Sequence, residues 1–158
     1  MRHLFFVYCL VCLCITGAQA QVRSTSIHFQ SLTINNGLSQ GFISSITQDR
    51  DGLMWFATSD GLNRYDGYNF AVYHNDADDR YSIGSDDLTY VFEDSRKRLW
   101  IGTRNNGLDY FDRENNSFYH IRDKEQSGLI SNSVSFISED SEGALWISTE
   151  SGIVRMEI

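Results

Sequence analysis

The sequence predicts an all-β fold, a partial β-propeller of about three four-stranded antiparallel blades that follow a signal peptide. Three observations lead to this prediction: tryptophans recur at nearly equal spacing, glycines and Asn/Asp clusters separate short apolar segments, and the 158 residues contain no proline. Trp55, Trp100 and Trp146 are separated by 45 and 46 residues. A β-sandwich, the second all-β possibility, predicts no such period.

Each tryptophan lies in the same local pattern. An aspartate precedes it by six residues, a threonine follows it by three, and a glycine follows the threonine after three or four. Aliphatic residues stand six and three positions before each aspartate, and a serine or threonine follows the first of them. We assign a structural role to the repeated positions, which are Asp49, Trp55, Thr58 and Gly61, then Asp94, Trp100, Thr103 and Gly107, then Asp140, Trp146, Thr149 and Gly152.

Residues 1–20 have the pattern of a secretory signal peptide. Arg2 and His3 form a basic start, an apolar run follows, and the small residues Ala18 and Ala20 mark a cleavage site. The apolar run is shorter than the roughly twenty residues that a membrane-spanning helix needs. All 3 cysteines lie in this segment, so we expect a secreted mature chain that folds without disulfides.

Charge limits the partners of the mature chain. Loss of Arg2 with the signal peptide leaves 12 of the 13 basic residues against 21 acidic ones, a net charge of −9. Such a charge disfavours nucleic acid and anionic membranes as partners.

The rest of the chain divides at the repeat. We expect a lead-in strand over 21–37, two complete repeats over 38–82 and 83–127, and an incomplete repeat over 128–158. Three blades do not close a ring that takes roughly four to eight, and open blade edges aggregate. The sequence therefore predicts a fragment of a longer protein.

The first copy shows how one repeat is expected to fold. Four strand segments, at 42–48, 53–57, 62–65 and 68–73, are separated by polar or glycine-containing turns. Because a lone sheet cannot bury both faces, we expect the tryptophans to fill the wedges between neighbouring blades.

The turn after each repeated aspartate has its own expected chemistry. The aspartates are expected to accept backbone N–H bonds within the turn, rather than to bind metal. Gly52 and Gly143 are expected to supply a positive φ, and Lys97 stands at the same position in the middle copy. That turn should either differ in type or carry strain of about 1 kcal/mol.

The segment from Ile46 to Gly67 closely resembles the two-component regulator propeller repeat. Residues 93–112 and 139–156 resemble the same repeat, and residues 29–39 are similar to the segment that begins such sensors. The resemblance implies the periplasmic sensor region of a Bacteroides-type hybrid histidine kinase anchored in the inner membrane. Its implied partners are further blades, signalling domains and a glycan-derived oligosaccharide, and this chain would hold only the beginning.

No catalytic residue, cofactor or metal is assigned. The Asp-box of sialidases has a different Asp-to-Trp spacing, and none of the 4 histidines has a kinase-like setting. Asp76, Asp78 and Asp79 suggest calcium by composition, but they lack the EF-hand order, so a solvated loop is preferred.

Side chains suited to bind sugars are present by type, although none is assigned as a ligand-binding residue. The alternatives to a sensor fragment are a secreted propeller enzyme, a lyase or a glycosidase, and a structural protein-interaction propeller. The sugar-type side chains are Tyr68, Tyr73, Tyr81, Tyr119, Arg64, Arg104 and Asn105.

Overall fold

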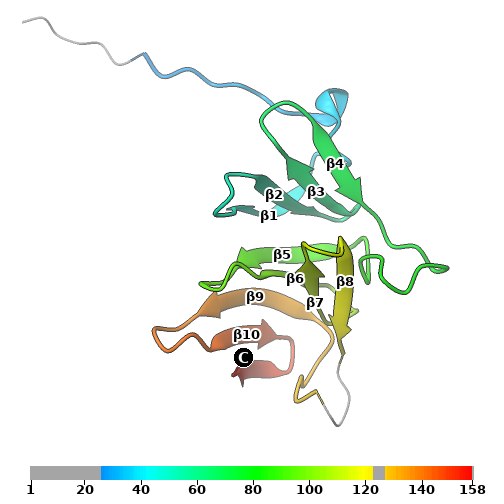
Figure 1. The fold of residues 1–158 in the computed structure, drawn as a ribbon, viewed down its shortest axis with the longest axis vertical. Coiled ribbons are helices and arrows are strands. Elements are labelled where there is room, and N and C mark those ends of the chain that lie inside the picture. Colours follow the sequence, from blue (N-terminus) through cyan, green and yellow to red (C-terminus); the bar gives the residue numbers. More distant parts are fainter. Residues whose placement is uncertain (1–25, 123–126, 158) are drawn as a thin grey trace, which may run out of the picture. The chain divides into compact units, whose positions relative to one another are not determined.

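The computed structural model describes residues 26–122 and 127–157. The chain divides into two units, residues 1–31 and 32–158. In the first unit, the described residues 26–31 are exposed and form no regular element. The second unit contains three antiparallel sheets (Figure 1), which confirms the all-β fold of three propeller blades.

Strands follow chain order across each sheet, with four strands in the first two sheets and three in the third among the described residues. Blade 1 contains β1 (Ile43–Gln48), β2 (Met54–Thr58), β3 (Leu62–Tyr65) and β4 (Phe70–Tyr73). Blade 2 contains β5 (Leu88–Glu93), β6 (Leu99–Thr103), β7 (Leu108–Asp112) and β8 (Ser117–Ile121). Blade 3 contains β9 (Val134–Glu139), β10 (Leu145–Thr149) and β11 (Gly152–Met156).

The first strand of every blade contains a bulge at the same repeat position. The register skips Ser44, Thr89 and Ser135, the hydroxyl residues that follow the first aliphatic residue of each copy. Side chains normally alternate between the two faces of a strand, and a bulge inverts that alternation. Aliphatic residues three positions apart, such as Val134 and Ile137, can therefore both be buried on one face.

Two buried clusters lie between neighbouring blades. Trp55 of blade 1 packs in the first cluster with Val91, Ile101 and other side chains of blade 2. Trp100 packs in the second cluster with Ile137 and other side chains of blade 3. We call the tryptophan-bearing face of a blade its back face, and the face that packs on the preceding blade its front face.

The third tryptophan differs from the other two. Trp146 lies on the back face of blade 3 and is 42% exposed, whereas Trp55 is fully buried. Because a tryptophan is covered by the front face of the following blade, Trp146 lies at an open end of the stack within the described part of the chain.

The lead-in differs from the expected strand over 21–37. Its described part, residues 26–37, contains only the short 3-10 helix η1 (Ile34–Asn36). Thr33 and Asn36 form a reciprocal cap, in which the Thr33 N–H donates to Asn36 Oδ1 at 2.9 Å. Gly37 then ends the turn with a φ of 105°.

The three aspartate turns have one geometry despite the lysine in the middle copy. Gly52, Lys97 and Gly143 have φ values of 88°, 66° and 85°. Each donates its N–H to the carbonyl of the aspartate three residues earlier, at 3.0, 3.0 and 3.1 Å respectively. The turn at Lys97 therefore has the same type as the two glycine turns. Of the two expectations, a different turn type or backbone strain, the structure agrees with strain at Lys97.

Replacing Lys97 with glycine should therefore raise the free energy of unfolding by about 1 kcal/mol, because the positive φ is relieved. The matched control is Gly52→Ala, which should lower it by about 1 kcal/mol through φ strain, since a Cβ at Gly52 meets no atom within 4 Å. Urea unfolding followed by circular dichroism measures both changes. A destabilising Lys97→Gly variant would show that the lysine side chain matters more than its backbone.

Candidate functional site

The repeated residues come together as one hydrogen-bonded module in each blade. In blade 1 the indole Nε1–H of Trp55 donates to Asp49 Oδ2 at 2.7 Å. The other oxygen, Oδ1, accepts the backbone N–H groups of Asp51 at 3.0 Å and Leu53 at 2.8 Å. A buried carboxylate thus holds the turn before β2 and the ring within β2.

The same module recurs in blades 2 and 3. The indole groups of Trp100 and Trp146 donate to Asp94 and Asp140 at 2.9 and 2.8 Å. In both blades Oδ1 of the aspartate accepts the N–H groups two and four residues later, as in blade 1. The aspartates therefore act within their turns, which leaves little capacity for a ligand.

The repeated threonine and glycine close the next turn. The hydroxyl of Thr58 donates to the carbonyl of Gly61 at 2.8 Å, and the pairs Thr103–Gly107 and Thr149–Gly152 are bonded at 2.8 and 3.0 Å. The middle copy has one more residue between threonine and glycine, and its pair keeps the same bond. Insertion is therefore accommodated in the turn itself.

A carboxylate of each following blade binds the aspartate turn of the blade before it. Glu93 accepts the backbone N–H of Arg50 at 3.1 Å. Glu139 accepts the backbone N–H of Ser95 at 2.7 Å and its hydroxyl at 2.6 Å. We call this contact the inter-blade latch, because it joins equivalent residues of blades 1 and 2 and of blades 2 and 3.

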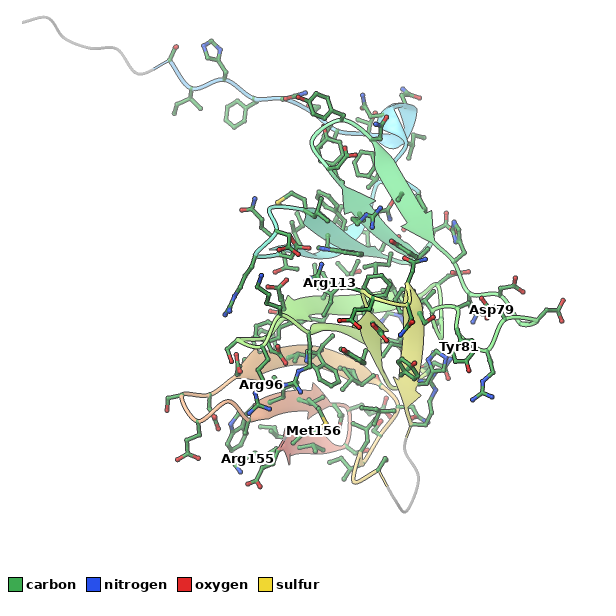
Figure 2. The ribbon with its side chains drawn as sticks, in the orientation of Figure 1. Asp79, Tyr81, Arg96, Arg113, Arg155 and Met156 are labelled. Carbon is green, nitrogen blue, oxygen red and sulfur yellow. The ribbon has the colours of Figure 1, made fainter. Side chains whose placement is uncertain are left out.

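Arg113 connects the latch to the buried aspartate of blade 1. Its guanidinium donates to Asp49 Oδ2 at 2.8 Å and to Glu93 Oε2 at 2.7 Å. Figure 2 shows its side chain between the two blades. Sequence reasoning missed this residue, because nothing at position 113 repeats. The arginine neutralises two carboxylates that are almost fully buried.

All three repeated aspartates have a pKa below the ordinary value of 3.8. Burial raises the pKa of Asp49 and of Asp94, but hydrogen bonds from their tryptophans and nearby arginine and backbone groups outweigh it. For Asp140 the bond from Trp146 is the largest cause, followed by the Ala144 N–H, and the pKa falls to about 2.

The sugar-type side chains named above do not form one cluster. Tyr73 stacks on Trp55 in the core with ring centroids 5.9 Å apart, and Tyr68 stands alone at 89% exposure. Arg64 lies over the Tyr73 ring, 5.9 Å from its centroid. Tyr81 and Tyr119 meet edge to face at 6.2 Å, and both are exposed. Tyr110, which the sequence did not single out, stacks on Tyr119 at 6.3 Å.

The remaining polar candidates are apart from one another, with Arg64 in β3 and with Arg104 and Asn105 in the turn between β6 and β7. Arg64 lies over the Trp55 ring at 5.9 Å, and Arg104 binds Asp87 at 2.8 Å. Asn105 is exposed beside Arg104. The surface pair Tyr81 and Tyr119 is thus the best-formed candidate for a sugar contact.

The acidic loop between blades 1 and 2 is organised by its own backbone. Asp76 accepts the N–H of Asp78, and Asp79 accepts the N–H of Tyr81, both at 2.9 Å. Figure 2 shows Asp79 and Tyr81 in this protruding loop. Within residues 26–122 and 127–157, no group of three His, Cys, Asp or Glu side chains is arranged to hold a metal ion.

The described residues also contain no helix that is long and apolar enough to span a membrane.

The lowered aspartate pKa values make stability depend on pH. Unfolding returns the pKa of Asp140 from about 2 to 3.8, so the unfolded chain binds protons first as the pH falls. The stabilisation is fully present above about pH 4 and should be lost as the pH falls towards 2. Trp146→Phe should raise the pKa of Asp140, measured by carboxyl NMR titration. An unchanged pKa would contradict the role of the indole.

The buried ion pairs of Arg113 should matter more than an exposed pair. Arg113→Met leaves Asp49 and Glu93 without their cation and should lower the free energy of unfolding by about 2–4 kcal/mol. The control Arg104→Met removes an exposed pair with Asp87 and should cost less than about 1 kcal/mol. Chemical denaturation at neutral pH measures the free energy of unfolding of both variants. Equal losses in the two variants would contradict the special role of the buried Arg113 ion pairs.

Comparison with known proteins agrees with this geometry. Residues 37–60, 82–105 and 128–151 match the family described as two component regulator propeller. The chain is 34% identical over 77 residues to Histidine kinase P4 of Formosa agariphila, a match that covers 49% of this chain and 6% of that protein.

Solved structures of two-component system domains are also similar to this chain. An extracellular domain of a hybrid two-component system from B. thetaiotaomicron is 34% identical, with a TM-score of 0.75, over 82% of this chain and 19% of that one. A second such domain from the same organism is 27% identical, with a TM-score of 0.65, over 82% of this chain and 18% of its own. The chain thus spans less than a fifth of each of these relatives. The chain therefore carries three two-component regulator propeller repeats.

Proposed function

We propose that this chain forms part of the periplasmic sensor propeller of a hybrid histidine kinase, that it binds a glycan-derived oligosaccharide, and that it catalyses no reaction. The observation that carries the proposal is the threefold repeat, together with 34% identity to the extracellular domain of a hybrid two-component system. The further blades, the membrane anchor and the signalling domains of the sensor are part of this proposal.

The geometry supports a binding role. The polar groups of the repeated module bond to one another, so we assign those twelve residues to blade structure. Ligand recognition then falls to side chains that differ between copies and lie on the surface. Tyr81 and Tyr119 place two exposed aromatic rings next to each other, with Arg80 over the Tyr81 ring and Tyr110 against Tyr119. Aromatic rings stack on the apolar faces of sugar rings.

The signal-peptide pattern of residues 1–20 supports a periplasmic location, and the neighbours of known structure are extracellular domains. The alternatives of a propeller enzyme and of a structural interaction module have no observation in their favour in this structure.

A binding experiment tests the proposal. Titration of the chain with a panel of oligosaccharides from complex glycans should give saturable binding by calorimetry. Tyr81→Ala and Tyr119→Ala should each weaken it by about tenfold, since a lost stacking contact of about 1.4 kcal/mol corresponds to that factor. Tyr68→Ala is the matched control, because Tyr68 is exposed and distant from this pair in sequence and contacts.

The same samples also test the enzymatic alternative. Chromatography of the oligosaccharides after incubation should show unshortened chains. Appearance of shorter products would contradict the proposal and favour a lyase or a glycosidase.

A further inference from the structure

Blade 2 contains a buried carboxylate that lies outside the repeated module. Asp109 of β7 is fully buried, and its Oδ2 accepts the backbone N–H of Gly84 at 2.6 Å. Its Oδ1 contacts His120 Nδ1 at 2.8 Å and Arg122 Nη1 at 3.0 Å. We call residues 80–84, which lie between blades 1 and 2 in the chain, the connecting segment. Asp109 therefore fixes one end of the connecting segment to the sheet of blade 2.

His120 of β8 contacts the other end of the connecting segment. Its ring Nε2 lies 3.2 Å from the carbonyl oxygen of Arg80. Tyr81 follows Arg80 directly, and the Tyr81 carbonyl accepts the backbone N–H of Phe118 at 2.8 Å. The part of the segment that carries Tyr81 is thus held against β8 by one ring nitrogen and one backbone hydrogen bond.

Both ring nitrogens of His120 face oxygen acceptors. A neutral imidazole has one N–H and one lone pair, so it donates either to the Asp109 carboxylate or to the Arg80 carbonyl. The imidazolium has two N–H groups and donates to both oxygens at once. Binding of a proton to His120 therefore adds one hydrogen bond between β8 and the connecting segment.

Charged groups from three parts of the chain lie next to this ring. Asp109 on β7 attracts the imidazolium, whereas the Arg122 guanidinium, which follows β8, repels it and shares Asp109 Oδ1. The connecting segment contributes Arg80, whose guanidinium lies over the Tyr81 ring, 5.0 Å from its centroid. The His120 side chain is 27% exposed, so protons reach the ring from solvent.

Blade 1 forms the same anchor without a titratable group. Asn63 is the register equivalent of Asp109, and its Oδ1 accepts the backbone N–H of Ser39, before β1, at 2.9 Å. Val72 is the register equivalent of His120. Because this strand position accepts valine in blade 1, the blade does not need an imidazole there in order to fold.

We propose that His120 is a positioning residue that makes the candidate sugar contact depend on pH. In acid the imidazolium holds Arg80 and keeps the Tyr81 ring beside Tyr119, and in alkali this hydrogen bond is lost and the ring is held less firmly. The inference rests on the proposed function, because the tyrosine pair is the proposed contact with an oligosaccharide. It adds that the affinity for the oligosaccharide rises as the pH falls.

Hydrogen exchange of the Phe118 amide tests the positioning without any ligand, because this N–H bonds to the Tyr81 carbonyl. Histidine is the side chain that ordinarily changes charge between about pH 5.5 and about pH 8. The protection factor, corrected for the intrinsic effect of pH on exchange, should be about fivefold higher at the lower pH, which is the factor of about one net hydrogen bond.

Two substitutions of histidine by valine identify the group responsible. His120→Val, which copies Val72 of blade 1, should abolish the difference in protection between the two pH values. The matched control His74→Val removes the other histidine that is paired with an aspartate, Asp86, in the described part of the chain, and it should keep the difference. A wild type without the difference, or a His120→Val variant that keeps it, would overturn the proposal.

A third variant separates the hydrogen bond from the fold. His120→Gln places a neutral amide N–H near the position of Nε2, so the Phe118 amide should be equally protected at both pH values. Protection that still falls with rising pH in this variant would contradict the role of Nε2.

Calorimetry with the oligosaccharides of the panel that bind the wild type tests the link to recognition. Binding should be about fivefold tighter at about pH 5.5 than at about pH 8, and it should be independent of pH for His120→Gln. An affinity that does not change with pH, together with protection that does, would overturn the regulatory part of the proposal. Absence of any binding would contradict the proposed function, whereas the exchange experiment still decides whether His120 holds the connecting segment.

Discussion

The fold depends on one hydrogen-bonded carboxylate in each blade, which is buried in blades 1 and 2. The aspartate binds its tryptophan through one oxygen and two backbone N–H groups of the turn through the other, so a single side chain fixes both the turn and the ring. A buried charge is tolerated only when it is fully hydrogen-bonded, and this one has protein donors on both oxygens. Since the ring is the largest side chain of each inter-blade cluster, the position of the next blade follows from this bond.

Blades stack through a repeated set of contacts. Apolar side chains of a front face cover the tryptophan of the preceding back face, and a glutamate reaches back to the preceding aspartate turn. Among the described strands, the main contacts between blades thus join neighbouring blades, as in other repeat proteins, and stability accumulates by interface. This explains why the side chains on the outer faces of blades 1 and 3 are the exposed members of sets that are otherwise buried.

The residues that hold the blades together differ from the exposed side chains that could contact a ligand. The module uses polar groups that repeat, whereas the surface tyrosines belong to blade 2 and the loop before it and do not recur. A propeller can therefore keep its blade geometry while its surface loops change. It also means that the repeats by themselves do not locate a ligand site on this chain.

The sequence by itself determined the period, the strand content, the packing of Trp55 and Trp100 between blades and the position of the exceptional residue Lys97 in its turn. These features are local or periodic, so hydrogen-bonding turns and alternating apolar residues reveal them directly. Only the tertiary structure decided the rest. Arg113 contacts Asp49 across 64 positions of sequence, Tyr110 joins an exposed aromatic pair, and Trp146 is exposed although its pattern equals that of Trp55. Such properties depend on which blade lies against a given face, and a repeat encodes the same face in every copy whether or not a neighbour covers it.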